Sequence, residues 1–135
     1  SSSPADPILR ECLLLLGQAC RATARFKEAA EHYSSLIQKF PEYNKQAKIL
    51  LNCGECYVRA KQAADAVSFL QTASALDEAT PEVFYWLVEA QNRSEQSAAA
   101  LASFQMLLSK FPEHELAALS AYSAALILQK IDDNE

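Results

Sequence analysis

The same four residues, Lys-Phe-Pro-Glu, occur twice in this chain, at 39–42 and again at 110–113. The segments that lead into them, 35–38 and 106–109, also share one apolar pattern. Self-similarity at a fixed spacing is the sequence signature of stacked supersecondary units. The separation of 71 residues (110 minus 39) fits two units of about 34 residues, one of which has about three extra residues in its connecting loop. The sequence therefore predicts an array of repeats.

Three such units can be laid out along the chain, over about 10–43, 47–80 and 81–114, with a single helix at about 115–131 after them. Within each unit the apolar residues recur at intervals of three and four, which is the spacing of one face of a helix. Each unit is therefore predicted to be two helices. Residues 1–6 are expected to form an N-terminal tail, and 1–135 a single all-α domain.

Small residues and prolines punctuate the predicted helices. A missing side chain lets two backbones approach closely, and the residues expected at helix crossings are Gly17, Gly54, Ala29, Ala66 and Ala100. Pro41 and Pro112 each follow a helix that cannot continue through them. Asp6-Pro7 and Thr80-Pro81 are each expected to pair a capping side chain with proline at the first helical position.

This arrangement resembles the tetratricopeptide repeat family, whose units are helix-turn-helix pairs of about 34 residues. The first unit carries the family's pattern in Leu16-Gly17, Phe26-Lys27-Glu28-Ala29-Ala30, Tyr33 and Phe40-Pro41. The closing proline of the second unit arrives late, and the third unit has Val88 at the family's glycine and Gln91 at its usual aromatic position. The resemblance covers nearly the whole chain. It implies an α-solenoid, a right-handed superhelix of antiparallel helix pairs that binds other proteins.

The composition argues against several other functions. The chain has 2 glycines and no phosphate-cradling motif, so nucleotide binding by that route is not expected. Its 17 acidic and 12 basic residues give a net charge of −5, which disfavours binding to a nucleic-acid backbone. No segment reaches the roughly 18 consecutive apolar residues of a membrane span, so membrane insertion is not expected either.

Neither the cysteines nor the histidines form a recognisable catalytic or metal-binding set. Cys53 and Cys56 have the C-x-x-C spacing, but they fall within a predicted helix rather than at a helix start, where the dipole would lower a thiol pKa. A zinc site would need two further ligands. Cys20 and Cys53 are expected to be small buried residues of a cytosolic or nuclear protein. His32 and His114 have no nucleophile at a defining spacing, so we expect no catalysis and no cofactor or metal.

The resemblance also implies which residues line the binding surface, because the first helix of each unit lines the concave side of such a stack. The corresponding positions form three ladders: Leu14, Leu51, Tyr85 and Tyr122; Gln18, Glu55, Glu89 and Leu126; and Arg21, Arg59, Arg93 and Lys130. An apolar strip between carboxylates and guanidinium groups suits an amphipathic helix or an extended segment with apolar anchors. The structural alternative is that the basic side chains complement helix C-termini, while Leu14 and Leu51 pack against their own neighbours.

One known ligand class of the family can be compared with the sequence directly. Some members hold the acidic C-termini of chaperones through a clamp of lysine, asparagine, asparagine, lysine and arginine. The positions that correspond to this clamp are Leu14, Gln18, Asn52, Glu82 and Trp86. Only Asn52 matches, and Glu82 would repel the ligand carboxylate that a lysine should hold. A chaperone tail is therefore not the expected partner.

The two ends of the array predict a different kind of contact. Residues 13–16 are four consecutive leucines, and the last helix has a broad apolar surface made of Leu116, Leu119, Tyr122, Leu126, Ile127 and Ile131. Terminal repeats of an isolated array need a polar outer face. Either further repeats belong to a longer parent chain, as the start at Ser1 without methionine also suggests, or an end contacts a second copy or another subunit.

The predicted function is thus a non-catalytic protein-interaction module that binds a partner's apolar or amphipathic segment in its groove. The alternative is an architectural subunit that self-associates or docks through its terminal helices.

Overall fold

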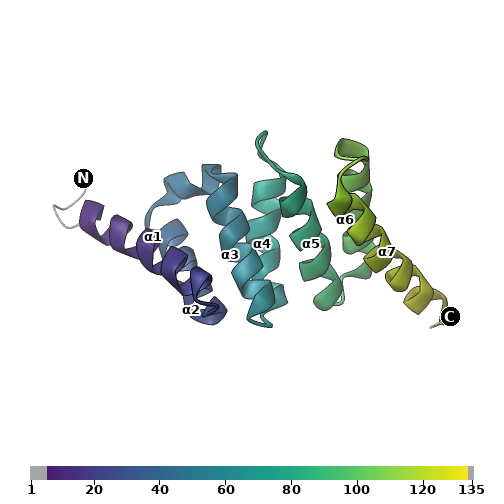
Figure 1. Ribbon diagram of the computed structural model, residues 1–135, viewed down its shortest axis with the longest axis horizontal. Helices are drawn as coiled ribbons and strands as arrows, with labels where there is room; N and C mark the ends of the chain where they lie inside the picture. Colours follow the sequence, from purple (N-terminus) through teal and green to yellow (C-terminus); the bar gives the residue numbers. More distant parts are fainter. Residues whose placement is uncertain (1–5, 134–135) are drawn as a thin grey trace.

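The computed structural model describes residues 6–133, which form α-helices and one short 3-10 helix (Figure 1). In chain order these are α1 (Asp6–Ala22), α2 (Phe26–Lys39), η1 (Pro41–Lys45), α3 (Ala47–Arg59), α4 (Ala63–Ser74), α5 (Pro81–Arg93), α6 (Ser97–Lys110) and α7 (Glu115–Asp133). The described residues contain no strand, so the predicted all-α class is confirmed. Of the predicted tail, only Asp6 is described, and it is already the first residue of α1.

The helices stack in one row as pairs, α1 with α2, α3 with α4 and α5 with α6 (Figure 1). Each second helix also packs against the first helix of the next pair, and α7 packs on α5 and α6. Direct contacts join α3 to α5 and α5 to α7, whereas no comparable contacts join α2 to α4 or α4 to α6 in the described range. The first helices therefore lie on the concave side of a solenoid, with α1 and α7 at its two ends.

Small residues lie where the helices of a pair cross, as predicted. A Cβ atom built at Gly54 would lie 2.4 Å from Cγ of Leu70, and one built at Gly17 would lie 3.0 Å from the ring of Tyr33. On the second helices the predicted small residues are completely buried: Ala29, Ala66 and Ala100. A larger residue at these positions would have to displace the side chain or the helix that it meets.

The third pair departs from this pattern because Val88 stands in place of glycine. Val88 is completely buried and packs in one cluster with Ala100 and with Ile127 of α7. Phe104, at the repeat position of the fully buried Leu70, is only partly buried at the edge of this cluster. Because Val88 on α5 is larger than glycine, it leaves less room at the crossing for Phe104 on α6.

Gln91 replaces the family's usual aromatic residue without leaving an unpaired polar group. It is 2% exposed, and its Oε1 accepts a hydrogen bond of 2.6 Å from the Ser103 hydroxyl. A buried amide is tolerated when it is hydrogen-bonded. The pair thus joins α5 to α6 by a polar contact in place of aromatic packing.

Proline sets helix boundaries as predicted, but the expected capping by Thr80 is wrong. Helices α2 and α6 end just before the segments that hold Pro41 and Pro112, and Pro81 is the first residue of α5. The Thr80 side chain makes no capping hydrogen bond. A capping hydroxyl would normally accept a hydrogen bond from the Val83 N–H. This N–H donates instead to the Thr80 carbonyl oxygen at 3.1 Å. Asp6, the other residue expected to cap a helix, is the first residue of α1.

The tight turn inside each pair contains one non-glycine residue in the left-handed region. These residues are Ala24, Lys61 and Glu95, with φ of 62°, 63° and 62°. In the first turn, the N–H of Arg25 donates to the Cys20 carbonyl oxygen at 2.7 Å, and equivalent bonds close the other two turns. This is the six-to-one hydrogen bond that ends many helices, usually with glycine at the left-handed position.

Candidate partner-binding groove

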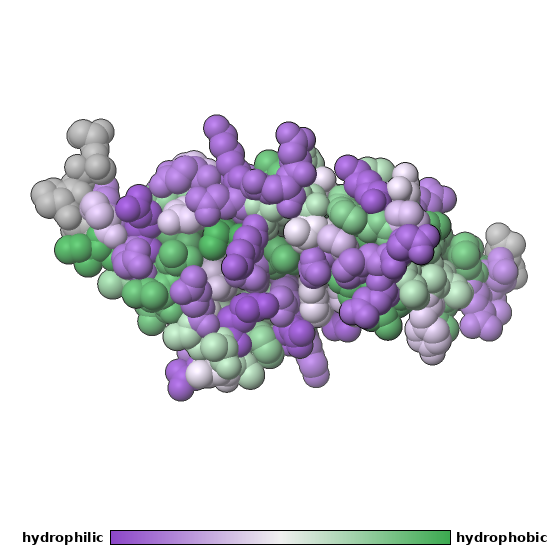
Figure 2. All heavy atoms as spheres, turned by 45° about the horizontal axis from the view of Figure 1, so that its top comes forward, coloured by the Kyte–Doolittle hydropathy of each residue, from purple (hydrophilic) through white to green (hydrophobic). Residues whose placement is uncertain are grey.

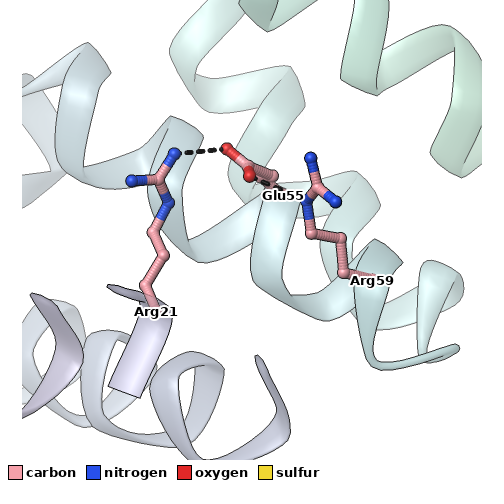
Figure 3. Close-up of polar contacts among 3 residues, drawn as sticks. All are labelled: Arg21, Glu55 and Arg59. Carbon is pink, nitrogen blue, oxygen red and sulfur yellow. Dashed lines mark hydrogen bonds and ion pairs between the residues drawn. The ribbon is translucent and has the colours of Figure 1, made fainter. Parts of the chain in front are cut away.

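The polar centre of the concave face is built around Glu55 on α3. Its carboxylate accepts from Arg21 of α1 through Oε1 and from Arg59 through Oε2, each at 2.9 Å (Figure 3). The Glu55 side chain is only 10% exposed. The hydrogen bond to Glu55 raises the pKa of Arg21. Two residues from one predicted ladder and one from another are thus brought into a single ion-pair cluster that links the first two repeats.

Arg59 also lies close to two aromatic rings. Its guanidinium carbon lies 5.3 Å from the centre of the Phe26 ring and 5.0 Å from the centre of the Trp86 ring. Such contacts attract a cation to the face of a ring. Phe26 is on α2, in the first repeat, and Trp86 is on α5, in the third. Arg59 of the second repeat therefore contacts both neighbouring repeats, while its Nε donates to Glu55.

A related arrangement recurs one repeat further along, around Glu89. Its Oε1 accepts from the Ser123 hydroxyl of α7 at 3.0 Å, and its Oε2 lies 3.6 Å from Nε of Arg93. Glu55 and Glu89 occupy the same repeat position, and each pairs with the arginine four residues later. The two carboxylates at the centre of the groove are therefore already paired within the chain.

The predicted apolar ladder changes in exposure along the array. Leu14 and Leu51 are partly buried and pack against the core cluster of the first two repeats, as the structural alternative proposes. Tyr85 is partly buried and meets the Trp86 ring edge to face, with centroids 5.2 Å apart. Burial raises the pKa of Tyr85. Tyr122, at the α7 end, is 70% exposed. The apolar surface open to solvent therefore grows toward α7.

The remaining groove candidates make fewer contacts. Gln18, Leu126 and Lys130 are exposed side chains on α1 and α7. Leu126 comes four residues after Tyr122 on α7, and residues spaced by four are neighbours on a helix face. Together they extend the apolar ladder on α7.

A pocket opens where α3 and α5 begin, at one edge of the groove. It has a volume of about 530 Å³, and its lining combines the apolar side chain of Leu51 with charged groups. The lining residues are Gln46, Ala47, Lys48, Leu51, Glu78, Thr80 and Glu82. The Glu78 carboxylate also accepts the Ala47 N–H at 3.3 Å. A cavity of this size accepts a side chain from a bound segment.

Sequence reasoning missed Lys48 and Glu78 as lining residues. Lys48 occupies the repeat position of Glu82, one repeat earlier, so the same register that singled out Glu82 could have found it. Glu78 lies in the connection between α4 and α5, where the helical repeat gives no register. Its place in the pocket depends on the course of that connection.

The cysteines lie as predicted, and His114 has a structural contact. Cys53 and Cys56 are buried within α3, and burial raises the pKa of both thiols, that of Cys56 to about 12. His114 accepts the Leu116 N–H through Nδ1 at 3.0 Å, directly before the start of α7. Within 6–133, no group of three or more His, Cys, Asp or Glu side chains is placed to hold a metal ion.

None of the helices between residues 6 and 133 is both long and apolar enough to cross a membrane.

Comparison with solved structures supports the fold. The first TPR domain of the human RPAP3 protein superimposes with a TM-score of 0.75 at 18% identity, covering 96% of this chain and 99% of that one. The MamA protein gives 0.76 at 20% identity, with 91% of this chain and 64% of that chain covered. The first TPR of Spaghetti (RPAP3), solved with the HSP90 peptide SRMEEVD, gives 0.72 at 18% identity over 97% and 96% of the two chains. No curated protein sequence matches the chain.

Family models identify the repeats as tetratricopeptide repeats. Two models, each described as tetratricopeptide repeat, match residues 21–85 and 82–114. Together they span 21–114, which includes the whole of α2, α3, α4, α5 and α6. Repeats of this kind form modules for protein interaction. The chain belongs to the tetratricopeptide repeat family.

Proposed function

We propose that this chain is a non-catalytic interaction module whose concave groove binds an apolar or amphipathic segment of a partner protein. The observation that carries the proposal is the pairing of the central charges. Glu55 and Glu89 are each engaged by groups of the chain itself, whereas Tyr85 and Tyr122 offer aromatic surface beside them. Apolar and aromatic contacts are therefore the main interactions left for a ligand in this groove.

The arginines shape the groove more than they attract charge to it. Arg59 lies close to two aromatic rings and donates from its Nε to Glu55, so part of its guanidinium group is already engaged within the chain. Arg93 is 54% exposed and freer to meet an acidic residue at the edge of a bound segment. Such rim charges affect association rate and orientation more than affinity.

The tails of chaperones, which similar structures carry as peptides, do not suit this groove. Glu82 stands at a clamp position where a lysine is needed, and it shares the pocket with a second carboxylate, Glu78. Two carboxylates beside one lysine, Lys48, would oppose a ligand that ends in acidic residues. This argument favours an apolar ligand with no acidic terminus.

The proposal can be tested with peptides selected from a random displayed library on the wild-type chain. We expect the selected peptides to be rich in apolar residues, and to lose at least tenfold in affinity for the double variant Tyr85→Ala, Tyr122→Ala. Circular dichroism of the variant should match that of the wild type, because both side chains are at least partly exposed.

Leu108→Ala provides the matched control, since Leu108 is an exposed apolar residue on α6, outside the groove. Its affinity for the selected peptides should be unchanged. Peptides that bind the double variant as tightly as the wild type would place recognition on another surface.

A second candidate function, docking through the terminal helices, is favoured by where large apolar side chains are exposed. Among the described residues they lie only on α1, α6 and α7: Ile8, Leu9, Leu15, Leu16, Met106, Leu108, Leu119, Tyr122, Leu126, Leu128 and Ile131. Figure 2 shows green side chains gathered at the end where α1 lies, while hydrophilic side chains cover much of the middle. Exposed apolar patches of this kind commonly mark interfaces.

A further inference from the structure

Helix α1 has a second apolar face, opposite the one that it buries. Its buried residues are Leu13, Gly17 and Cys20. The opposite stripe consists of Ile8, Cys12, Leu15 and Ala19, all exposed. Intervals of four, three and four residues place these side chains in one row along a helix. The stripe contains no charged or hydrogen-bonding side chain other than the thiol of Cys12.

The position of α1 in the stack explains why this face is bare. Helix α3 lies between α2 and α4, and α5 lies between α4 and α6, so both are covered on two sides. In the described structure, α1 packs only against α2 among the second helices. Ile8 is left 68% exposed and Leu15 53% exposed. Covering such side chains is favourable, because each one buries apolar area that water now contacts.

We propose that this stripe pairs with the same stripe of a second copy, the two α1 helices running antiparallel about a twofold axis. The inference deepens the second candidate function and is independent of the groove. The stripe alternates in size along the helix, with large Ile8 and Leu15 and small Cys12 and Ala19. In antiparallel register about the midpoint of Cys12 and Leu15, Ile8 faces Ala19 of the second copy, and Leu15 faces its Cys12. Large side chains then meet small ones throughout, as close packing requires.

The edges of the stripe are compatible with the same symmetry. A twofold axis brings like edges together, because such an interface uses one patch on both copies. Leu9 and Leu16 lie along one edge, and in this register each is offset by two residues from the level of the other across the axis. Glu11 and Gln18 lie along the other edge, offset by two residues in the same way, so the carboxylate is nearer to an amide than to the second copy's carboxylate. No like charges are therefore opposed in the pairing.

The first test is the solution mass of the full chain across a concentration series. One helix face from each copy makes a small interface, so we expect a monomer at low concentration and a mass that doubles on reaching about 1 mM. Leu15→Glu should remain monomeric throughout, since it would bury an unpaired carboxylate. Leu126→Glu, which changes a similarly exposed leucine on α7, is the matched control and should still double in mass.

The second test examines the register through thiol crosslinking. Cys12 is the exposed cysteine, while Cys20, Cys53 and Cys56 are buried. Leu15→Cys should yield a covalent dimer under mild oxidation, because residue 15 of one copy lies opposite Cys12 of the other. The same substitution combined with Cys12→Ser should yield far less dimer, and Gln18→Cys, beside the stripe, should crosslink poorly.

The outcomes separate this inference from the proposed functions. A wild-type mass that stays monomeric to about 1 mM, without crosslinking of Leu15→Cys, overturns the α1 pairing and leaves peptide binding in the groove unaffected. A dimer that Leu126→Glu abolishes and Leu15→Glu does not would also overturn it, while supporting docking through α7. Crosslinking of Gln18→Cys as efficient as that of Leu15→Cys would rule out the register proposed.

Discussion

Gly54 leaves the space that the Leu70 side chain occupies: a Cβ atom at position 54 would lie 2.4 Å from Cγ of Leu70 and 2.6 Å from one of its methyl carbons. Both residues are in the crossing of α3 with α4 and are fully enclosed. Leu70 is completely buried, so a shift of its side chain would have to displace buried neighbours. We therefore expect Gly54→Ala to lower the free energy of unfolding by about 1–3 kcal/mol, despite the better helix propensity of alanine. Urea denaturation measures this.

Gly17→Ala is the natural comparison for that substitution. The nearest atoms are those of the flat Tyr33 ring, at 3.0 Å rather than 2.4 Å. A small shift of the ring can relieve this contact, and the gain in helix propensity of up to about 1 kcal/mol offsets part of the cost. The loss at position 17 should be clearly smaller than that at position 54. An equal loss of unfolding free energy at both sites would show that the close approach of the two helices does not determine the cost of the added Cβ atom.

Glu55 should matter more to stability than its relative one repeat later. In Glu55→Gln one of the two acceptor oxygens is replaced by an NH2 group that faces an arginine donor, and we expect a loss of about 1–2 kcal/mol in the free energy of unfolding. Arg21 and Arg59 are 40% and 45% exposed, so water limits the penalty. Glu89→Gln, whose arginine lies 3.6 Å away, should cost less. Chemical denaturation at two salt concentrations would compare the variants, and a larger effect for Glu89→Gln would contradict this account.

Most of the fold can be predicted from the sequence because the same helical pattern recurs in each repeat. The spacing of apolar residues and the positions of Gly17, Gly54 and Pro81 each agree with the helices found. Local chemistry was less predictable. The sequence predicts that the Thr80 hydroxyl caps α5, but the hydroxyl makes no capping hydrogen bond. The Val83 N–H donates to the Thr80 backbone carbonyl oxygen instead. Two acceptors compete at such a position, and the sequence does not reveal which one wins.

The candidate groove could be predicted as a set of positions but not as a set of contacts. The register placed Arg21, Glu55 and Arg59 near one another, yet their ion pairs depend on side-chain conformations and on the distance between α1 and α3. The contact of Arg59 with Phe26 and Trp86 depends on three helices at once. Pairwise spacing along the chain contains no such information.

Stability should fall in alkaline solution partly because of the buried thiols of α3. Burial raises the pKa of Cys56 from its ordinary value of 9.0 to about 12 in the folded chain. A thiol whose pKa is raised on folding contributes stability that is complete below the unfolded pKa and is lost as pH rises toward the folded one. The loss should therefore begin above pH 9.0. Thermal unfolding of the wild type from pH 7 to 10 should show this decline, and Cys56→Ala should show a shallower one. Parallel curves for the two would refute a role for this thiol.

The left-handed turn residues offer a way to stabilise the array. Ala24 has φ of 62°, a conformation that costs an alanine about 1–2 kcal/mol and a glycine far less. Ala24→Gly should therefore raise the free energy of unfolding, by about 0.5–1 kcal/mol after the greater entropy of the unfolded glycine is included. Ala22→Gly, within the last turn of α1, is the control and should lower it. Calorimetry should therefore show a higher unfolding temperature for Ala24→Gly and a lower one for Ala22→Gly than for the wild type.

The HSP90 peptide SRMEEVD, which was solved with a similar domain, should not bind this chain. Glu82 and Glu78 line the pocket at the edge of the groove, and the nearest cluster of arginines is already paired with Glu55. Fluorescence anisotropy with a labelled peptide should therefore detect no saturable binding, whereas the Spaghetti domain serves as the positive control.

A gain-of-function variant makes that negative result informative. Replacing Leu14 and Glu82 by lysine and Gln18 by asparagine restores three clamp positions beside Asn52 and leaves Trp86, which contacts Arg59, in place. Each lysine adds a charge-assisted contact to the peptide carboxylates, so this triple variant should bind the peptide with measurable affinity that falls as salt rises. Saturable binding to the wild type would mean that the carboxylates of the pocket do not exclude acidic tails. Absence of binding to both chains would show that the geometry of the groove, and not only its charge, excludes this ligand.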